Sequence, residues 1–512
     1  MTALNSMISR SAQWFSTATA VTDGRRILSF ADVDSRSNRL AQVLLGYSGE
    51  LGARVAMLMP NCVEAVEVDF AIIKSGKVKV PINVRLSPDE RAYLIGDSGA
   101  ETLIFDSSAE DSVAEILDGL PDLRFLLRIG PGTLGDDYED SLLAAADSLP
   151  AVTLEPAAPS LFLYTSGTTG RPKGAITTNG SRLAGTLNML ASEIDPRPGD
   201  AMAHVGSMAH GSGSKILAHF LRGSRNVPVA KWDPHEFLRI VATTRATHTF
   251  LVPTMISQLV DAASTSDDDW SCLKTITYGG APMPAARLEA ALDVLGPRLV
   301  QVYGSCEAPH PVLVLTAEDH MRGGNVLSAA GREVVGVETR LLTSDGSPAL
   351  DGEPGELVVR GANVMSGYWQ KPEATNEVLH DGWYRTGDVA LRDADGYIYI
   401  VDRARDLIIS GGYNVYPAEV EAVLARHAAV AEVAVVGVPD DQWGEAVRAV
   451  VVRSEDATAT ESELIDFCAQ NLAGYKKPKA IDFVGELPHG STNKVLRREL
   501  RDRYWNGQQR RV

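Results

Sequence analysis

Short apolar runs alternate with helix-length amphipathic stretches in the first part of the chain. The apolar runs predict buried strands at Val55–Met59, Val78–Ile82 and Thr102–Phe105, and the stretches between them predict helices at Val63–Lys74 and Pro88–Asp97. Strands that alternate with helices are typical of βαβ units, which assemble a parallel sheet. This pattern therefore predicts an α/β fold.

The same alternation returns after residues 130–158, a Gly-, Asp- and Pro-rich segment that we interpret as a connection. It predicts strands at Ala201–Val205, Asn226–Val229, His248–Val252, Lys274–Tyr278 and Leu299–Val302, and helices at Ser212–Leu221, Pro234–Thr244, Thr254–Ala263 and Pro284–Leu295. Ligands of such sheets gather beyond the carboxyl ends of the strands. We therefore expect the binding residues in the loops that follow these strands.

The pattern changes in the last third of the chain. Short alternating strands between Glu338 and Arg360 predict a small β-rich subdomain, and the charged run Asp402–Asp406 is suited to a linker. The residues beyond it have a strand and helix pattern of their own, enough for a small domain. We predict a large N-terminal domain of βαβ-layered sheets at residues 1–403, with the β-rich subdomain at about 330–403, and an α+β C-terminal domain at residues 404–512.

Composition narrows the function classes. The 512 residues carry a net charge of −18, and 45% of them are hydrophobic. An acidic surface argues against nucleic acid or an anionic membrane as the main partner. An anionic substrate must then be captured by a local basic pocket rather than by the field of the whole protein.

The location follows from the cysteines and from the apolar runs. Four scattered cysteines show neither metal-ligand spacing nor a disulfide framework, which suits a reducing compartment. Residues 1–16 lack the basic region and apolar core of a secretory signal, and no apolar run approaches the roughly 20 residues of a membrane span. We expect a cytoplasmic protein without an integral membrane segment.

A loop of hydroxyls and glycines follows the apolar run Leu161–Leu163 and is closed by Lys173. Glycines let backbone N–H groups point into one concavity, a nest suited to anionic oxygens. The hydroxyl and glycine positions expected to hold polyphosphate are Thr165, Ser166, Gly167, Thr168 and Thr169. Because Gly174 follows the lysine, this loop lacks the Gly-Lys-Ser/Thr order of the common P-loop.

The stretch from Tyr164 to Gly174 resembles the signature loop of the adenylate-forming superfamily, which contains acyl- and aryl-CoA synthetases, peptide-synthetase adenylation domains and beetle luciferases. The resemblance covers nearly the whole chain. It implies an acid–thiol ligase that joins a carboxylate to the α-phosphate of ATP, releases pyrophosphate and passes the acyl group to CoA. ATP, Mg²⁺ and CoA are the expected cofactors.

Further motifs in the first domain resemble those of the family. The run from Tyr303 to Glu307 is similar to the family's Tyr-Gly-x-Thr-Glu, which implies that Tyr303 and Gly304 contact adenine and that Glu307, with Thr165, binds Mg²⁺. Cys306 stands where the family usually has Thr, and a thiol is a weaker hydrogen-bond partner than a hydroxyl. The segment Gly279-Gly280-Ala281-Pro282 is expected to border the adenine and acyl pockets.

Later motifs imply the ribose site and a mobile C-terminal domain. Asp388 is expected to bind the ribose diol, Arg403 to contact the nucleotide, and Arg405 to form the hinge. Gly411, Gly412 and Tyr413 are expected to line the pantetheine tunnel. Lys494, in a motif similar to the family's C-terminal lysine motif, is expected to stabilise the adenylation transition state.

The identity of the acid stays open. The expected acyl wall contains His204, Met208, His210, Phe250 and Gly279, and His210 is also a candidate catalytic residue with Glu307 and Lys494. Residues 207–214 hold no Asp that would pair with an amino acid's ammonium. We expect a hydrophobic acid, with a medium- or long-chain fatty acid preferred. The alternative functions are an aryl-CoA ligase and a non-catalytic nucleotide-binding relative. A separate carrier protein could accept the acyl group in place of CoA. The sequence does not fix the oligomeric state, and a homodimer is one possibility.

Overall fold

The computed structural model describes residues 3–165, 171–343, 345–403, 406–410, 413–440, 443–455, 457–490 and 495–505, with backbone only at 402–403, 409, 413–414 and 444. The chain divides into two compact units. The first unit comprises residues 1–338 and 359–384, and the second comprises residues 339–358 and 385–512. The predicted division at residue 403 is a different partition, and it stays a prediction.

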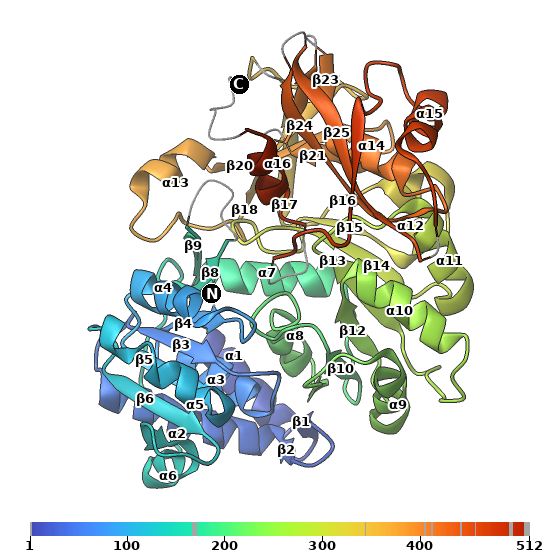
Figure 1. The fold of residues 1–512 in the computed structure, drawn as a ribbon. Helices are drawn as coiled ribbons and strands as arrows, with labels where there is room; N and C mark the ends of the chain where they lie inside the picture. Colours follow the sequence, from blue (N-terminus) through green and yellow to red (C-terminus); the bar gives the residue numbers. More distant parts are fainter. Residues whose placement is uncertain are drawn as a thin grey trace. The chain divides into compact units, whose positions relative to one another are not determined.

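The first unit contains a mainly parallel sheet that confirms the first predicted alternation (Figure 1). Its order within the described residues is β7-β6-β5-β3-β4-β8-β9, and only β9 pairs antiparallel, with β8. The strands are β3 (Arg54–Leu58), β4 (Val78–Ile82), β5 (Thr102–Asp106), β6 (Phe125–Ile129), β7 (Asp136–Asp137), β8 (Pro159–Tyr164) and β9 (Gly174–Thr178).

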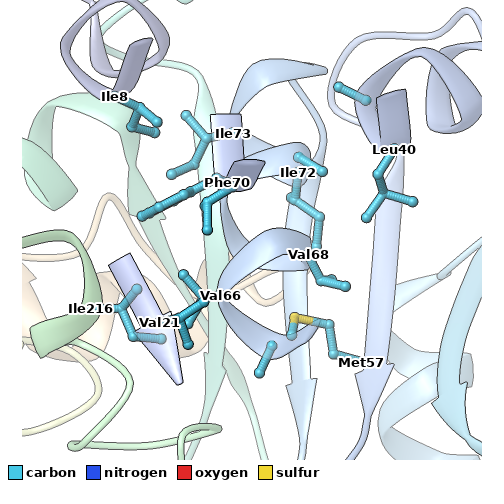
Figure 2. Packing of buried hydrophobic residues seen from close by; sticks show 14 of the residues in the cluster. Ile8, Val21, Leu40, Met57, Val66, Val68, Phe70, Ile72, Ile73 and Ile216 are labelled. Atoms are coloured by element: carbon cyan, nitrogen blue, oxygen red, sulfur yellow. The ribbon is translucent and has the colours of Figure 1, made fainter. Parts of the chain in front are cut away.

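Helices cover both faces of this sheet because successive strand residues point to opposite sides. Val55 and Met57 of β3 join a core with α2 (Phe30–Tyr47) and α3 (Glu64–Lys74), whereas Ala56 and Leu58 join another with α4 (Pro88–Ser98). Figure 2 shows side chains of α3 in the first core, where Val66, Val68, Phe70, Ile72 and Ile73 are at most 1% exposed. A helix buried on all sides in this way is a central element of the fold.

A second sheet in the first unit confirms the later alternation. Its described order is β16-β15-β14-β13-β12-β10-β11-β1-β2. The central parallel strands are β11 (Arg225–Pro228), β10 (Ala201–His204), β12 (His248–Leu251), β13 (Thr275–Gly279) and β14 (Leu299–Tyr303). The outer strands are β1 (Thr19–Thr22), β2 (Ile27–Ser29), β15 (Leu313–Leu315) and β16 (Arg332–Glu333).

The predicted helices of this region are also present. They are α8 (Lys215–Leu221), α9 (Pro234–Thr244), α10 (Pro253–Ala263) and α11 (Ala285–Leu295), and α7 (Asn179–Ser192) follows β9. The segment at 130–158 differs from its interpretation as a plain connection, because it contains β7 and the helix α6 (Tyr138–Ala144). Asp137 caps this helix, and Tyr138 and Leu142 anchor it in the core.

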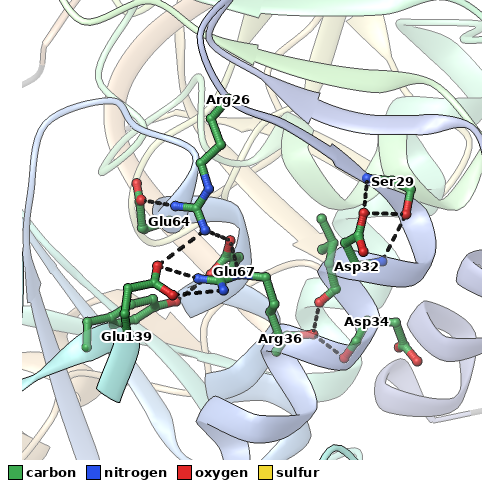
Figure 3. A network of polar contacts seen from close by, with 11 residues as sticks. Arg26, Ser29, Asp32, Asp34, Arg36, Glu64, Glu67 and Glu139 are labelled. Carbon is green, nitrogen blue, oxygen red and sulfur yellow. Dashed lines mark hydrogen bonds and ion pairs between the residues drawn. The ribbon is translucent and has the colours of Figure 1, made fainter. Parts of the chain in front are cut away.

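A network of charged side chains links α2, α3 and α6 (Figure 3). Arg36 donates to Oε1 of Glu67 at 2.9 Å and to Glu139, while Tyr138 donates to Oε2 of Glu67 at 2.7 Å. The side chain of Glu67 is fully buried. Removing one partner of such a buried charge is strongly destabilising, so this network fixes how the three helices pack.

The second unit holds the C-terminal sheet, described as β23-β22-β25-β24 with β26 beside β25. These strands are β22 (Ile408–Ser410), β23 (Tyr413–Val415), β24 (Val430–Asp440), β25 (Gly444–Arg453) and β26 (Ala480–Val484). The helices α14 (Pro417–Leu424) and α15 (Glu461–Asn471) share a core with one face of this sheet, and α16 (Arg497–Trp505) shares one with the other. These elements agree with the expected α+β pattern.

Another sheet comprises β17 (Val337–Leu342), β18 (Gly355–Gly361), β19 (Leu379–His380), β20 (Trp383–Arg392) and β21 (Ile398–Arg403). This sheet confirms the β-rich pattern near Glu338 to Arg360, and the boundaries between the two units fall inside β17, β18 and β20. The described helices include none that is both long enough and apolar enough to span a membrane.

Candidate active site

The signature loop leaves β8 and returns through β9, which pair antiparallel with Tyr164 opposite Gly174. The N–H of Thr165 donates to the carbonyl of Lys173 at 3.0 Å. The two ends of the loop are therefore joined at its base, as a phosphate-binding turn requires. Ser166, Gly167, Thr168 and Thr169 lie outside the described residues, so the interior of the loop stays a prediction.

Lys173 lies near an acidic residue that is far away in the sequence. Its Nζ is 5.3 Å from the centre of the Tyr368 ring, and the Tyr368 hydroxyl donates to Oε1 of Glu307 at 2.8 Å. Burial and the charge of Glu307 raise the pKa of Tyr368. The phenol of Tyr368 therefore keeps its proton. This one side chain contacts both Lys173, the predicted phosphate-binding cation, and Glu307, the predicted Mg²⁺ ligand.

The backbone around Glu307 is held on both sides. Its N–H donates to Oγ of Ser305 at 3.2 Å, and its carbonyl accepts from the N–H of Met365 at 2.7 Å. Tyr368 occupies only Oε1, and Oε2 has no hydrogen-bond partner among the described residues. One carboxylate oxygen is thus available to a ligand.

The donor set can be compared with what Mg²⁺ requires. In the described part of the chain, no three His, Cys, Asp or Glu side chains gather as a metal cage. Mg²⁺ in nucleotide enzymes is usually bound by one or two carboxylates together with substrate phosphates. Glu307, with one accessible carboxylate oxygen near Lys173, fits that mode of binding.

Cys306 points back to the strand that precedes the signature loop. Its Sγ lies 3.7 Å from the carbonyl oxygen of Tyr164, within the weak hydrogen-bonding range of a thiol. The hydroxyl of Tyr164 in turn donates to Asp97 at 2.9 Å. The thiol therefore makes a weak contact at the entrance to the signature loop, where the family usually places a hydroxyl.

Two glycines are required by close packing of the loops that follow β13 and β14. A Cβ on Gly279 would lie 2.4 Å from the carbonyl oxygen of Val302, and one on Gly304 would lie 2.6 Å from the backbone nitrogen of His310. Neither neighbour can move without disturbing its strand or loop. Three further predicted residues are exposed just beyond β13, at Gly280, Ala281 and Pro282, and Tyr303 ends β14 half-buried.

His204 is engaged inside the second sheet. Its side chain is fully buried, Nδ1 lies 3.0 Å from Oγ of Ser212, and Nε2 lies 2.8 Å from Oδ1 of Asn226. Burial lowers the pKa of His204 to about 4. Both ring nitrogens are satisfied by the protein, so neither is available to a substrate.

Met208 and His210 lie in the loop after β10. Asn61, after β3, holds this loop by accepting from the N–H of Met208 at 2.8 Å and donating to the carbonyl of Gly206 at 3.0 Å. Nε2 of His210 lies 3.2 Å from Nδ2 of Asn83, and burial of the ring lowers the pKa of His210. Asn61 and Asn83 were not singled out from the sequence, although both follow predicted strands.

The structure brings Phe250 next to the loop of His210. A Cβ on Gly211 would lie 3.0 Å from Cε1 of Phe250 and 3.4 Å from Nε2 of His310. Phe250 stacks on the His310 ring at a centroid distance of 5.6 Å and an interplanar angle of 16°. His310 was missed by the sequence analysis, although its position three residues after Glu307, in a loop after a strand, was a usable signal.

Asp388 lies on β20 in the second unit, opposite Arg403 of β21. Its side chain is largely buried, and its N–H donates at 3.0 Å to Oγ1 of Thr386, which donates to the carbonyl of Leu357. The strand therefore holds Asp388 in place. Several predicted residues lie outside the described part of the chain, in whole or in their side chains: Arg403, Arg405, Gly411, Gly412, Tyr413 and Lys494.

Comparison with known proteins gives two family matches. The AMP-binding enzyme family matches residues 8–369, and the AMP-binding enzyme C-terminal domain matches residues 419–494. The chain is 39% identical to a feruloyl-CoA synthase from Amycolatopsis sp, over 95% of this chain and 96% of that protein. It is 34% identical to the medium/long-chain-fatty-acid–CoA ligase FadD8 of Mycobacterium tuberculosis, over 93% of this chain and 86% of that protein.

A solved structure shows the same likeness. ATP-bound MatB from Rhodopseudomonas palustris matches with a TM-score of 0.89 and 29% identity, over 98% of this chain and 99% of that chain. The family match covers more than half of the chain and agrees with the motifs quoted from the sequence. The chain therefore belongs to the AMP-binding enzyme family, and its expected place among the adenylate-forming ligases is confirmed.

Proposed function

We propose that the chain activates a hydrophobic carboxylic acid with ATP and transfers the acyl group to the thiol of CoA. The observation that carries this proposal is the arrangement of Lys173, Tyr368 and Glu307 at the base of the signature loop. It combines a cation for phosphate oxygens with a carboxylate for Mg²⁺, which is what phosphoryl chemistry on ATP needs. The named relatives, which are CoA ligases, support the acceptor.

In the first half-reaction a carboxylate oxygen attacks the α-phosphorus, and the bond from this phosphorus to the oxygen bridging to the β-phosphate breaks. Pyrophosphate leaves and the acyl-adenylate remains. Lys173 and the loop hydroxyls would stabilise the charge on the departing pyrophosphate. Glu307 and the hydroxyl of Thr165 would hold the Mg²⁺ that accompanies ATP, an ion that neutralises charge on the phosphate oxygens.

In the second half-reaction the CoA sulfur attacks the acyl carbon, the bond from this carbon to the AMP oxygen breaks, and the thiol proton passes to water. Asp388 and Arg403 would hold the nucleotide during both steps. Lys494 would act on the first step alone, and a rotation at Arg405 would then present Gly411, Gly412 and Tyr413 to CoA. A cytoplasmic location belongs to the same proposal, because none of the four cysteines forms a disulfide.

The acid is the least constrained part of the proposal. Met208 and Phe250 are apolar and buried, which suits a fatty acid, and we retain a fatty acid as the first candidate. The parallel stack of Phe250 on His310 offers a flat wall and favours an aromatic acid as the second candidate. The feruloyl-CoA synthase among the relatives supports this alternative.

Carboxylate-dependent exchange of radioactive pyrophosphate into ATP tests the proposal directly. The panel should pair fatty acids of several lengths with benzoate- and cinnamate-type acids, followed by thioester detection after CoA is added. We expect exchange with at least one hydrophobic acid and a CoA thioester of the same acid. A chain that binds ATP but exchanges pyrophosphate with no acid would instead be a nucleotide-binding relative without catalysis.

A further inference from the structure

Both ends of the signature loop are fastened to the helix α4. At the entry, the hydroxyl of Tyr164 donates to Oδ2 of Asp97 at 2.9 Å. At the exit, the hydroxyl of Tyr93 donates to the carbonyl of Pro172 at 2.8 Å. Pro172 directly precedes Lys173, so α4 holds the chain just before the loop begins and again just before its lysine.

One carboxylate joins the two anchors. Oδ1 of Asp97 lies 3.3 Å from the hydroxyl of Tyr93, while Oδ2 accepts from Tyr164. Tyr93 and Asp97 are four residues apart on one helix, so they lie on the same face. An ionised carboxylate only accepts, so Tyr93 shares its proton between Asp97 and Pro172, with the shorter bond to Pro172. Burial and the charge of Asp97 raise the pKa of both tyrosines, which keeps the two donors protonated.

The ring of Tyr164 also lies against the returning strand. Gly174 stands opposite Tyr164 in the pairing of β8 with β9, and a Cβ on Gly174 would lie 3.2 Å from Cζ of Tyr164. The ring is therefore held between its hydrogen bond to α4 and the backbone that follows Lys173. Loss of the bond to Asp97 would free this ring, and with it the strand end that carries the lysine.

The stability of the fold does not by itself account for the carboxylate of Asp97. Its side chain is 12% exposed, and Nζ of Lys371, 3.5 Å from Oδ1, belongs to a side chain that is 43% exposed. An ion pair of this length and exposure contributes little, whereas removing a carboxylate from water costs free energy. The side-chain hydrogen bonds of Asp97 in the described structure go to the two tyrosines that hold the signature loop.

We propose that Asp97 is a positioning residue for ATP, which acts through Tyr93 and Tyr164 to hold the two ends of the signature loop where Lys173 meets the β- and γ-phosphates. This inference rests on the proposed function, in which the loop holds the polyphosphate. AMP lacks both of these phosphates, so Asp97 matters for the affinity of ATP and not for that of AMP. Thioester formation from acyl-adenylate, which involves no polyphosphate, is likewise independent of Asp97.

The size of the effect follows from the cost of ordering the loop. A loop that is held in its binding geometry before the ligand arrives pays less for immobilisation when the ligand binds. Without Asp97 this cost falls on ATP, and loss of a hydrogen bond to a charged group corresponds to about a tenfold rise in the Kd of ATP. The ratio of the Kd of AMP to the Kd of ATP, measured by calorimetry with Mg²⁺ present, isolates the contribution of the two terminal phosphates.

The main test is Asp97→Ala, since alanine is the residue best tolerated in a helix. We expect the ratio to fall about tenfold through the Kd of ATP, with the Kd of AMP unchanged. Tyr164→Phe should lower the ratio as well, and combining it with Asp97→Ala should add little, because both changes remove the same bond. Asp136→Ala is the matched control: Asp136 also accepts from a tyrosine, Tyr47, but lies on β7, at the opposite edge of the first sheet from β9. It should leave the ratio unchanged.

A purely structural role for Asp97 would lower the melting temperature and weaken ATP and AMP equally, and an unchanged ratio would overturn the inference. A wild-type ratio near one would also overturn it, because the loop would then not hold the polyphosphate. If Asp97→Ala does not fold, Tyr93→Phe decides the question, since it releases Pro172 and keeps Asp97 bonded to Tyr164; the ratio should again fall. Failure of the proposed function looks different: no acid then supports pyrophosphate exchange in the wild-type protein, whereas these binding measurements need no acid.

Discussion

The hydroxyl of Tyr368 donates a 2.8 Å hydrogen bond to Oε1 of Glu307. This contact joins the loop after β14 to a segment more than sixty positions further along the chain, and the N–H of Trp369 fastens that segment to the carbonyl of Gly174. Tyr368 therefore contacts both ends of the predicted phosphate site, Lys173 through its ring and Glu307 through its hydroxyl.

Tyr368→Phe should weaken Mg²⁺ and ATP use without unfolding the protein. The ring that faces Lys173 remains, but the carboxylate of Glu307 loses the bond that orients it. Hydrogen bonds to charged groups contribute about 1.5–3 kcal/mol, so we expect a tenfold or greater fall in kcat/KM for ATP at limiting Mg²⁺. Titration of pyrophosphate exchange with Mg²⁺ measures this fall.

The control for this experiment is Tyr47→Phe. Tyr47 also donates to a carboxylate, that of Asp136, at 2.5 Å, but its ring stacks on Phe125 and makes no contact with Glu307. It should leave the Mg²⁺ dependence unchanged. If both variants shift the Mg²⁺ titration equally, Tyr368 has no special role in orienting Glu307.

The sequence predicted the strands and helices of the first unit well because their signals are local. Apolar runs such as Val78–Ile82 end at polar loops, and Ser87 with Glu90 forms a capping box at the start of α4. Helix α6 was missed because the acidic residues that start it lie in a Gly- and Pro-rich segment. Its stability comes from burial of Tyr138, which composition does not reveal.

The site was predicted as motifs but not as contacts. Glu307 and Lys173 were identified from their own loops, whereas Tyr368 carried no motif and became visible only when the chain was folded. For His204 the motif pointed to a contact that the structure does not show. A histidine at the carboxyl end of a strand is well placed to line the acyl pocket, and His204 was predicted there for that reason. Its ring turns into the sheet because Asn226 on the neighbouring strand accepts its hydrogen bond. Pairing of this kind depends on strand order, which sequence spacing does not give.

Cys306→Thr should raise the rate of adenylation. Sγ of Cys306 makes a weak 3.7 Å contact with the carbonyl of Tyr164, and a hydroxyl is a stronger partner for both this carbonyl and a substrate oxygen. A gain of about 0.5–1.5 kcal/mol corresponds to a several-fold increase in kcat for pyrophosphate exchange. Cys272→Ser is the control, because its thiol also faces carbonyl groups, those of Val241 and Ala246. Equal rates for Cys306→Thr and wild type would show that the thiol is no handicap.

Acid should destabilise the second sheet through its buried histidines. Burial lowers the pKa of His204 and of His248 to about 4. Below pH 6.5 the unfolded chain binds protons that the folded rings exclude, so stability is complete above that pH and falls as the pH drops towards 4. Each ring contributes on the order of 2 kcal/mol to this loss at pH 5.

Thermal unfolding at pH 7 and pH 5 measures this dependence. His248→Gln should lower the melting temperature at pH 7, because the Thr247 contact is altered, but should show a smaller further drop at pH 5. His235→Gln replaces an exposed histidine and should keep the full pH dependence. A His248→Gln protein that loses as much stability between pH 7 and pH 5 as the wild type would contradict the assignment.

Lys494→Ala should separate the two half-reactions. The proposed role of this lysine is to neutralise charge where the carboxylate meets the α-phosphate, which matters only while the adenylate forms. We expect pyrophosphate exchange to fall by at least a hundredfold, while CoA thioester formation from supplied acyl-adenylate stays close to the wild-type rate. Lys231→Ala, an exposed lysine in the first unit, should affect neither assay. Equal losses in both assays for Lys494→Ala would mean that the lysine supports the fold, or binds the nucleotide, in both steps. The proposal that Lys494 acts only in the first half-reaction would then be wrong.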